Sequence, residues 1–161
     1  MTGVTSPRIE TLRVRNLRSI GAEPLIVRFP QEGTLVLLGE NNAGKSNITR
    51  SLDILFGEPW PGNRQLAEHD FHGRDSDGIA VEIEAAVAGL PCSYCPVEVQ
   101  HLSWRCDPQG VADDGGPVAY RFTCTRCSKT FPDRRMRAAL SATMIDADRR
   151  LDYQLSYASK Y

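Results

Sequence analysis

Alternation of apolar and polar residues marks several short strands along this chain. Residues 9–15 place Leu12 and Val14 on one face and Arg13 and Arg15 on the other, and residues 25–29 and 118–122 also read as strands. The clearest example is residues 79–87, which follow a period of two over their whole length. This period is that of a half-buried β-strand. We therefore expect two antiparallel strands near the N-terminus and a further strand at 79–87.

A glycine-rich stretch, residues 39–46, lies between two different patterns. Residues 35–38 are a continuous apolar run, which predicts a strand buried on both faces. Residues 47–56 repeat their apolar positions at helical spacing, and Gly57 then ends the predicted helix. Strand, glycine loop and helix form the structural context in which a phosphate-binding loop occurs.

The stretch itself spells Gly, four free positions, Gly, Lys and Ser, which is the phosphate-loop pattern. Glycines at 39 and 44 permit backbone angles and close approaches that a Cβ would block. Lys45 is expected to reach the β- and γ-phosphates and to be the catalytic residue, while the Ser46 hydroxyl helps to hold Mg²⁺. The alternative is a glycine turn that matches the pattern by coincidence. We expect the whole stretch to bind nucleotide: Gly39, Glu40, Asn41, Asn42, Ala43, Gly44, Lys45 and Ser46.

Composition limits the class of protein. The chain has 161 residues, of which 41% are hydrophobic, and its 19 Lys and Arg nearly balance 20 Asp and Glu. It is therefore not an obvious electrostatic nucleic-acid binder as a whole. No apolar run approaches the length of a membrane span, and residues 1–10 lack the apolar core of a signal peptide. We expect a cytoplasmic protein.

Four of the five cysteines form two Cys-x-x-Cys pairs, at Cys92, Cys95, Cys124 and Cys127. Four thiolates complete the tetrahedral shell of a structural Zn²⁺, and a reducing compartment argues against disulfides. The interval between the pairs exceeds the usual ribbon spacing of roughly 15–20 residues, and we interpret most of it as a loop before the 118–122 strand. Cys106 is then a spare thiol, and His101 is a possible substitute ligand. Free or redox-active thiols are the alternative interpretation.

Residues 58–78 are interpreted as mostly loop. They contain His69, Asp70 and His72, which could bind a metal, although an exposed polar loop is the commoner structure for such a sequence.

The C-terminal part predicts a helix at 132–140, a short apolar run at 142–146 that ends in Asp146, and an amphipathic stretch at 151–161. The last stretch has no capping residue and no Pro or Gly stop. We therefore expect the chain to be a piece of a longer protein.

The wording around the glycine loop resembles the start of the OLD family of ATP-dependent endonucleases. Residues 16–20, 37–48 and 52–57 carry this likeness, and residues 145–157 add to it. Those enzymes are ABC-type ATPases similar to the SMC and RecF proteins. The resemblance covers residues 8–88 and 138–161, so the cysteine segment reads as an insertion.

The resemblance implies several further assignments. Asn47 would lie beside the phosphates, and Gln154 would correspond to the glutamine that senses Mg²⁺ and γ-phosphate. ABC-type ATPases hydrolyse ATP between two subunits, so it also implies a homodimer, and DNA as a partner of the complete protein. However, the chain lacks the family's signature motif, an apolar strand ending in Asp-Glu, a switch histidine and the acidic Toprim nuclease site. We expect it to bind ATP with little turnover alone.

Together these patterns predict an α/β fold: a phosphate-loop ATPase lobe with a mixed sheet and a projecting zinc ribbon. The expected divisions are 1–90 for the first part of the lobe, 91–131 for the zinc-ribbon element and 132–161 for the return to the lobe. Two alternatives remain open. One is a small stand-alone kinase or NTPase with Asp146 as a second Mg²⁺ ligand, and the other is a non-enzymatic zinc-ribbon adaptor on a nucleotide-binding scaffold.

Overall fold

The computed structural model describes residues 6–40, 43–74, 79–92, 94–95, 98–108, 118–124, 126–128, 130–131 and 140. Its elements, in chain order, are one α-helix, three short 3₁₀ helices and six strands: β1 (Arg8–Arg15), β2 (Leu25–Arg28), α1 (Lys45–Phe56), η1 (Pro61–Asn63), η2 (Glu68–Asp70), η3 (His72–Arg74), β3 (Val81–Pro91), β4 (Glu98–Cys106), β5 (Val118–Thr123) and β6 (Thr130–Phe131). The strands predicted at 9–15, 25–29, 79–87 and 118–122 and the helix predicted at 47–56 are therefore confirmed.

The six strands form one antiparallel sheet in the order β2-β1-β3-β4-β5-β6. The pairing register of the strands defines the two ends of the sheet. At one end Arg15 lies opposite Glu82, and Val81 lies opposite Cys106. At the other end Leu90 pairs with Val99. We call these the Arg15 end and the Pro91 end.

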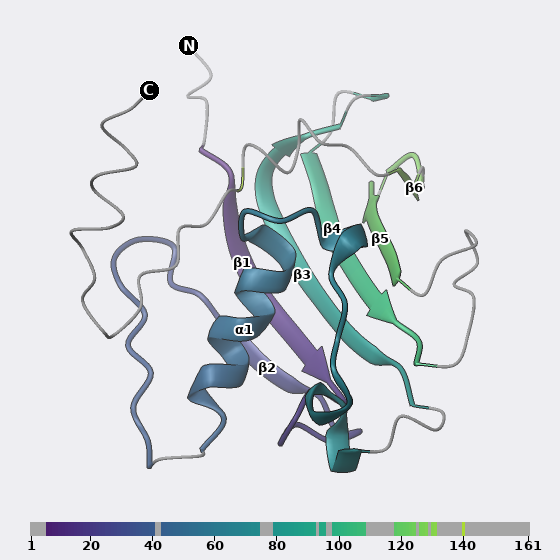
Figure 1. Ribbon diagram of the computed structural model, residues 1–161. Helices are drawn as coiled ribbons and strands as arrows, with labels where there is room; N and C mark the ends of the chain where they lie inside the picture. Colours follow the sequence, from purple (N-terminus) through teal and green to yellow (C-terminus); the bar gives the residue numbers. More distant parts are fainter. Residues whose placement is uncertain are drawn as a thin grey trace, which may run out of the picture.

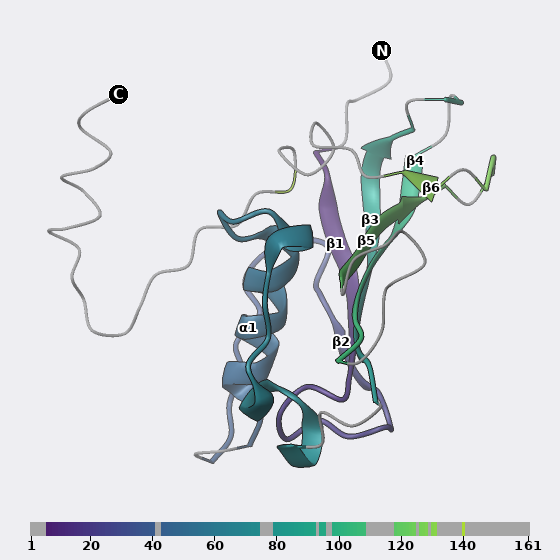
Figure 2. The ribbon, with the colours of Figure 1, turned by 45° about the vertical axis from the view of Figure 1, so that its right-hand side comes forward.

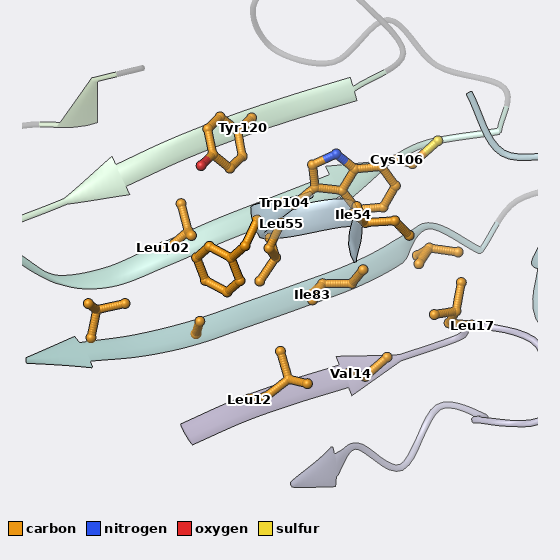
Figure 3. Close-up of a cluster of buried hydrophobic side chains, with 14 of the residues drawn as sticks. Leu12, Val14, Leu17, Ile54, Leu55, Ile83, Leu102, Trp104, Cys106 and Tyr120 are labelled. Atoms are coloured by element: carbon orange, nitrogen blue, oxygen red, sulfur yellow. The ribbon is translucent and has the colours of Figure 1, made fainter. Parts of the chain in front are cut away.

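Helix α1 covers one face of the sheet (Figure 1), and the turned view shows helix and sheet as two layers (Figure 2). The apolar face of the sheet and the helix side chains Ile54 and Leu55 meet between these layers (Figure 3). Trp104 is 1% exposed and its indole N–H donates to the Pro61 carbonyl oxygen at 2.9 Å. This bond ties the segment after α1 to β4.

The opposite face of the sheet is polar and carries cross-strand ion pairs. Arg13 reaches Glu84 at 2.8 Å, and Glu82 receives Arg105 at 2.6 Å and Arg15 at 3.6 Å. Such exposed pairs each contribute roughly 0–1 kcal/mol to stability. Alternation of apolar and charged residues along β1 and β3 thus divides buried from exposed faces, as expected from the sequence.

Strand β4 was not predicted, because the sequence between the cysteine pairs reads as loop. Leu102, Trp104 and Cys106 nevertheless alternate with polar residues, and all three are buried. β3 and β4 pair antiparallel, and β5 then pairs with β4. The interval between the cysteine pairs therefore contains two strands that extend the same sheet.

The buried strand predicted at 35–38 is wrong for the described structure. Residues 34–40 form no strand, and Val36 and Leu38 are 67% and 88% exposed. A strand buried on both faces needs neighbours on both edges, and the sheet of the described residues is antiparallel with no place for this segment. The expectation of a mixed sheet is corrected in the same way: the described sheet is wholly antiparallel.

The expectations for 132–139 and 141–161, including Asp146 and Gln154, fall on residues that the structure does not describe. Within the described part of the chain, no helix is long and apolar enough to cross a membrane.

Candidate functional site

The first turn of α1 is built on a glycine in left-handed conformation. Gly44 caps the helix with φ of 88°, a backbone angle that residues with a Cβ adopt at a cost. The helix begins at the next residue, Lys45, so the free N–H groups and the positive end of the helix dipole lie at the end of the glycine stretch. This end of the helix is suited to an anion.

Lys45 folds its side chain back over the glycine stretch. Its ammonium donates to the carbonyl oxygens of Gly39 at 2.6 Å and of Glu40 at 2.5 Å. Ala43 closes a turn onto Glu40, with its N–H donating to that carbonyl at 3.2 Å. Ser46 is exposed beside it. Asn41 and Asn42 lie outside the residues that the structure describes.

A turn after β1 packs against this helix start. The Asn47 side chain is buried and donates from Nδ2 to the Ser19 hydroxyl at 2.7 Å. A Cβ built at Gly44 would lie 3.8 Å from the same oxygen. Ser19 therefore contacts the first helical turn through Asn47 and lies near the side of Gly44 on which a side chain would stand. Sequence reasoning gave Ser19 no role, although it belongs to the 16–20 stretch that carries the family resemblance.

The 68–72 segment holds that turn from the other side. Leu17 forms an antiparallel bridge with Phe71, and the Arg18 N–H donates to the Asp70 carbonyl at 2.8 Å. Asp70 is 3% exposed, and its Oδ1 accepts from Arg18 at 2.8 Å. Burial alone would raise the pKa of the Asp70 carboxyl, but hydrogen bonds from Arg18 and Ala67 and the nearby arginine charges hold that pKa below its usual value. Asp70 is thus an ionised carboxylate at neutral pH.

The metal-binding alternative for His69, Asp70 and His72 finds no support in this geometry. The His72 ring, through Nδ1, lies 2.8 Å from the Arg18 carbonyl oxygen, and Asp70 is engaged by Arg18. These side chains hold the turn together and do not converge on a common point.

The four predicted cysteines do converge. Cys92, Cys95, Cys124 and Cys127 place their sulfur atoms within 4.8 Å of one another. The Sγ–Sγ distance is 3.8 Å between Cys92 and Cys127 and 3.5 Å between Cys95 and Cys124. A tetrahedron with metal–sulfur bonds of ~2.3 Å has edges of about 3.8 Å, so a metal ion fits this cluster.

Backbone N–H groups also point at the sulfurs. The Tyr94 N–H donates to the Cys92 sulfur at 3.4 Å. The pKa of Cys124 is lowered to about 6, chiefly by a hydrogen bond from the Cys127 backbone. Burial acts in the opposite direction, and hydrogen bonds from the Arg126 backbone and from the neighbouring sulfurs lower the pKa further. Thiolates are the form of cysteine that binds metal.

Cys106 differs from these four. It is 6% exposed within the core, and burial, with the negative charge of Asp107, raises its pKa to about 11. His101 lies exposed on β4 and is not a member of the cysteine cluster. The prediction that four cysteines suffice without His101 or Cys106 agrees with this geometry.

The two sites lie at opposite ends of the sheet. Ser19 and the start of α1 are at the Arg15 end, whereas the cysteine pairs follow β3 and β5 at the Pro91 end. β3 alone has 11 residues, a span of about 35 Å. A metal on the cysteines is therefore too far away to act on a phosphate at Lys45.

Solved structures with a similar fold exist for this chain. One solved structure matches with a TM-score of 0.57, and it comes from work titled "Structural biochemistry of ATP-driven dimerization and DNA stimulated activation of SMC ATPases". The match covers 95% of this chain and 99% of that chain at 15% identity. The fold is similar to that of an SMC ATPase. At this identity the likeness concerns the fold, and it does not distinguish the OLD family. No model of a protein family matches the chain, and no curated protein matches it.

Proposed function

We propose that the chain is the ATP-binding lobe of an OLD-like, ATP-dependent enzyme that acts on DNA. One observation carries the proposal: a left-handed glycine starts α1 at Lys45, and the Lys45 ammonium is held at the glycine stretch. This observation supports the proposal because a cation, a helix N-terminus and an exposed hydroxyl are the groups with which a phosphate loop binds its ligand.

Each residue has a defined task in this proposal. The Lys45 ammonium exchanges its two carbonyl partners for phosphate oxygens, which are better acceptors because they are charged. The Ser46 hydroxyl and the free N–H groups of the first helical turn bind the same region, and Asn47 orients that turn. Mg²⁺, when bound, neutralises charge on the β- and γ-phosphates. Gln154 is proposed to contact this Mg²⁺.

Replacing Lys45 tests the proposal directly. Loss of one charge-assisted interaction costs roughly 1.5–3 kcal/mol, so Lys45→Ala should weaken binding of ATP–Mg²⁺ about 10- to 100-fold. Isothermal titration calorimetry measures the affinity. Arg8→Ala is the matched control, because it removes an arginine whose exposed ion pair with Glu10 lies at the remote end of β1. Equal affinities for the wild type and Lys45→Ala would refute the proposed role.

DNA and a second copy of the chain are proposed as partners of the complete protein. The matching structure comes from work on ATP-driven dimerisation and DNA stimulation of SMC ATPases, and the motif resemblance points to OLD-like enzymes. Residues 1–90 and 132–161 belong to the ATPase lobe in this proposal. Nuclease chemistry belongs to a further part of the protein, and turnover by this chain alone is expected to be low.

We also propose that the four-cysteine cluster holds a structural Zn²⁺. The sulfur atoms are spaced as in a tetrahedral site, and backbone N–H groups donate hydrogen bonds to them. Both observations support this assignment. Four thiolates leave no open position for substrate, so the ion fixes the turn after β3 to the turn after β5 and performs no reaction.

Metal content provides the test of the cysteine proposal. Native mass spectrometry should find one zinc per chain in the wild type and in Cys106→Ala, and none in Cys124→Ser. Cobalt exchanged into the wild type should give the visible absorption of a tetrahedral sulfur site. A wild-type protein without zinc, or zinc retained in Cys124→Ser, would contradict the assignment.

A further inference from the structure

Asp70 is a buried carboxylate that the proposed chemistry does not use. Its side chain is 4% exposed and accepts hydrogen bonds on both oxygens. Arg18 donates from Nε to Oδ1 at 2.8 Å, its Nη2 lies 2.8 Å from the same oxygen in the ion pair, and the Ala67 N–H donates to Oδ2 at 3.2 Å. A charge in such a position is stabilised by specific partners, so its removal affects the partners as well.

The partner that matters is Arg18, because its backbone is in an unusual conformation. Arg18 has φ of 53° and Asn16 has φ of 57°, both in the left-handed region that residues with a Cβ rarely occupy. Four contacts from the 68–72 segment keep the turn in this conformation. They are the side-chain pair with Asp70, the Arg18 N–H on the Asp70 carbonyl, the His72 N–H on the Asn16 carbonyl, and the His72 ring on the Arg18 carbonyl.

The residue after Arg18 is Ser19, which is the contact to the candidate nucleotide site. Its hydroxyl accepts from the buried Asn47 side chain at 2.7 Å, and a Cβ at Gly44 would lie 3.8 Å from the same oxygen. A continuous chain of contacts therefore runs from Asp70 through Arg18 and Ser19 to the helix turn that begins at Lys45. Hydrogen bonds form the Asp70–Arg18 and Ser19–Asn47 links, and the peptide bond joins Arg18 to Ser19.

We infer that Asp70 is a positioning residue for nucleotide binding: it fixes the Arg18–Ser19 turn, and this turn fixes the Gly44–Asn47 start of α1. The inference rests on the proposed ATP-binding function. Asp70 contacts no nucleotide in this account. Its effect on affinity is transmitted through Ser19.

The first test compares two carboxylates that are paired with arginine, Asp70, which is buried, and Asp53, which is partly exposed. Asp70→Asn should weaken ATP–Mg²⁺ binding about tenfold, the lower end of the range for partners that orient direct ligands. Asp53→Asn is the matched control, since Asp53 is likewise paired with arginine, namely Arg50 at 3.2 Å and Arg64 at 3.1 Å, but lies near the other end of α1. It should leave the affinity unchanged even where it lowers the melting temperature.

A double-mutant cycle separates positioning from general stability. Ser19→Ala removes the last link and touches neither the buried pair nor the core. If Asp70 acts through Ser19, then Asp70→Asn combined with Ser19→Ala should bind ATP–Mg²⁺ no more weakly than the weaker single variant. Effects that multiply would overturn the inference, and so would wild-type affinity in Asp70→Asn.

A milder variant covers the case in which Asp70→Asn does not fold. His72 is exposed, and His72→Ala removes the ring contact to the Arg18 carbonyl. The same cycle with Ser19→Ala should again show non-multiplying effects. If the wild type binds no ATP–Mg²⁺, the proposed function fails. If the wild type binds and these variants bind equally well, the inference alone fails.

Discussion

Cys124→Ser is expected to lower the melting temperature by about 8–16 °C in the presence of zinc. A ligand at 1,000 times its dissociation constant stabilises the folded state by ~4.1 kcal/mol, and a protein of this size changes by about 2–4 °C per kcal/mol. The variant loses this term because serine does not replace the thiolate. Circular dichroism or scanning calorimetry at a fixed zinc concentration measures the shift.

Cys106→Ala is the control for this experiment, because Cys106 is buried, lies apart from the cluster and acts as a small apolar side chain. Its melting temperature should not respond to chelator beyond the response of the wild type. The zinc assignment also predicts that chelation destabilises the wild type and leaves Cys124→Ser unchanged. Equal responses of these two proteins would contradict it.

Trp104→Ala is expected to cost about 3–5 kcal/mol of unfolding free energy, a large part of the roughly 5–15 kcal/mol that a domain possesses. Trp104 is among the largest fully buried side chains, and its indole N–H satisfies the buried Pro61 carbonyl. The variant leaves a cavity between α1 and the sheet and removes one of the two hydrogen bonds that the Pro61 carbonyl accepts, while the bond from the Arg64 N–H at 3.2 Å stays. Urea denaturation followed by circular dichroism gives the free energy.

Ser103→Ala is the matched control, since Ser103 is the neighbouring residue of β4 on the opposite, polar face. It should change the free energy by less than about 0.5 kcal/mol. Trp104→Phe keeps much of the apolar volume and loses the hydrogen bond, so its cost should lie between the two. A loss below about 1 kcal/mol in Trp104→Ala would show that the core is not organised around this residue.

Local sequence patterns predict an element correctly where the residues of that element alone show which of its faces is buried. The alternation in β1 and β3 reports burial on one face, and the 45–56 helix carries its apolar face and its terminal Gly57 in the sequence. Strand β4 carries the same signal at Leu102, Trp104 and Cys106. The signal is weak, because the first half of the strand contains polar residues and because the strand stands between cysteine pairs whose spacing predicts a loop.

The 35–38 segment shows the limit of such patterns. Its apolar residues predict burial, but burial of a strand depends on neighbours that the segment does not itself supply. In the described structure Leu37 packs partly against the core while Val36 and Leu38 remain exposed. Hydrophobicity along the chain cannot report whether a neighbouring strand is present.

The candidate site shows the same division. The glycine stretch and the cysteine pairs are compact motifs whose residue types follow from phosphate and metal chemistry, so they can be found from sequence. Asp70 and Ser19 are distant in sequence, and their connection depends on the left-handed backbone at Arg18. No periodicity marks a tertiary hydrogen bond, and the pair becomes visible only when the fold brings both segments beside α1.

The exposed apolar residues of the 35–38 segment also govern how the purified chain is to be handled. An exposed apolar stretch that the sheet leaves unpaired is a template for strand addition by another molecule. Self-association should therefore increase with protein concentration, and light scattering should rise with it before any ligand is added. Affinity measurements are best made at low micromolar concentration, where self-association does not compete with the ligand.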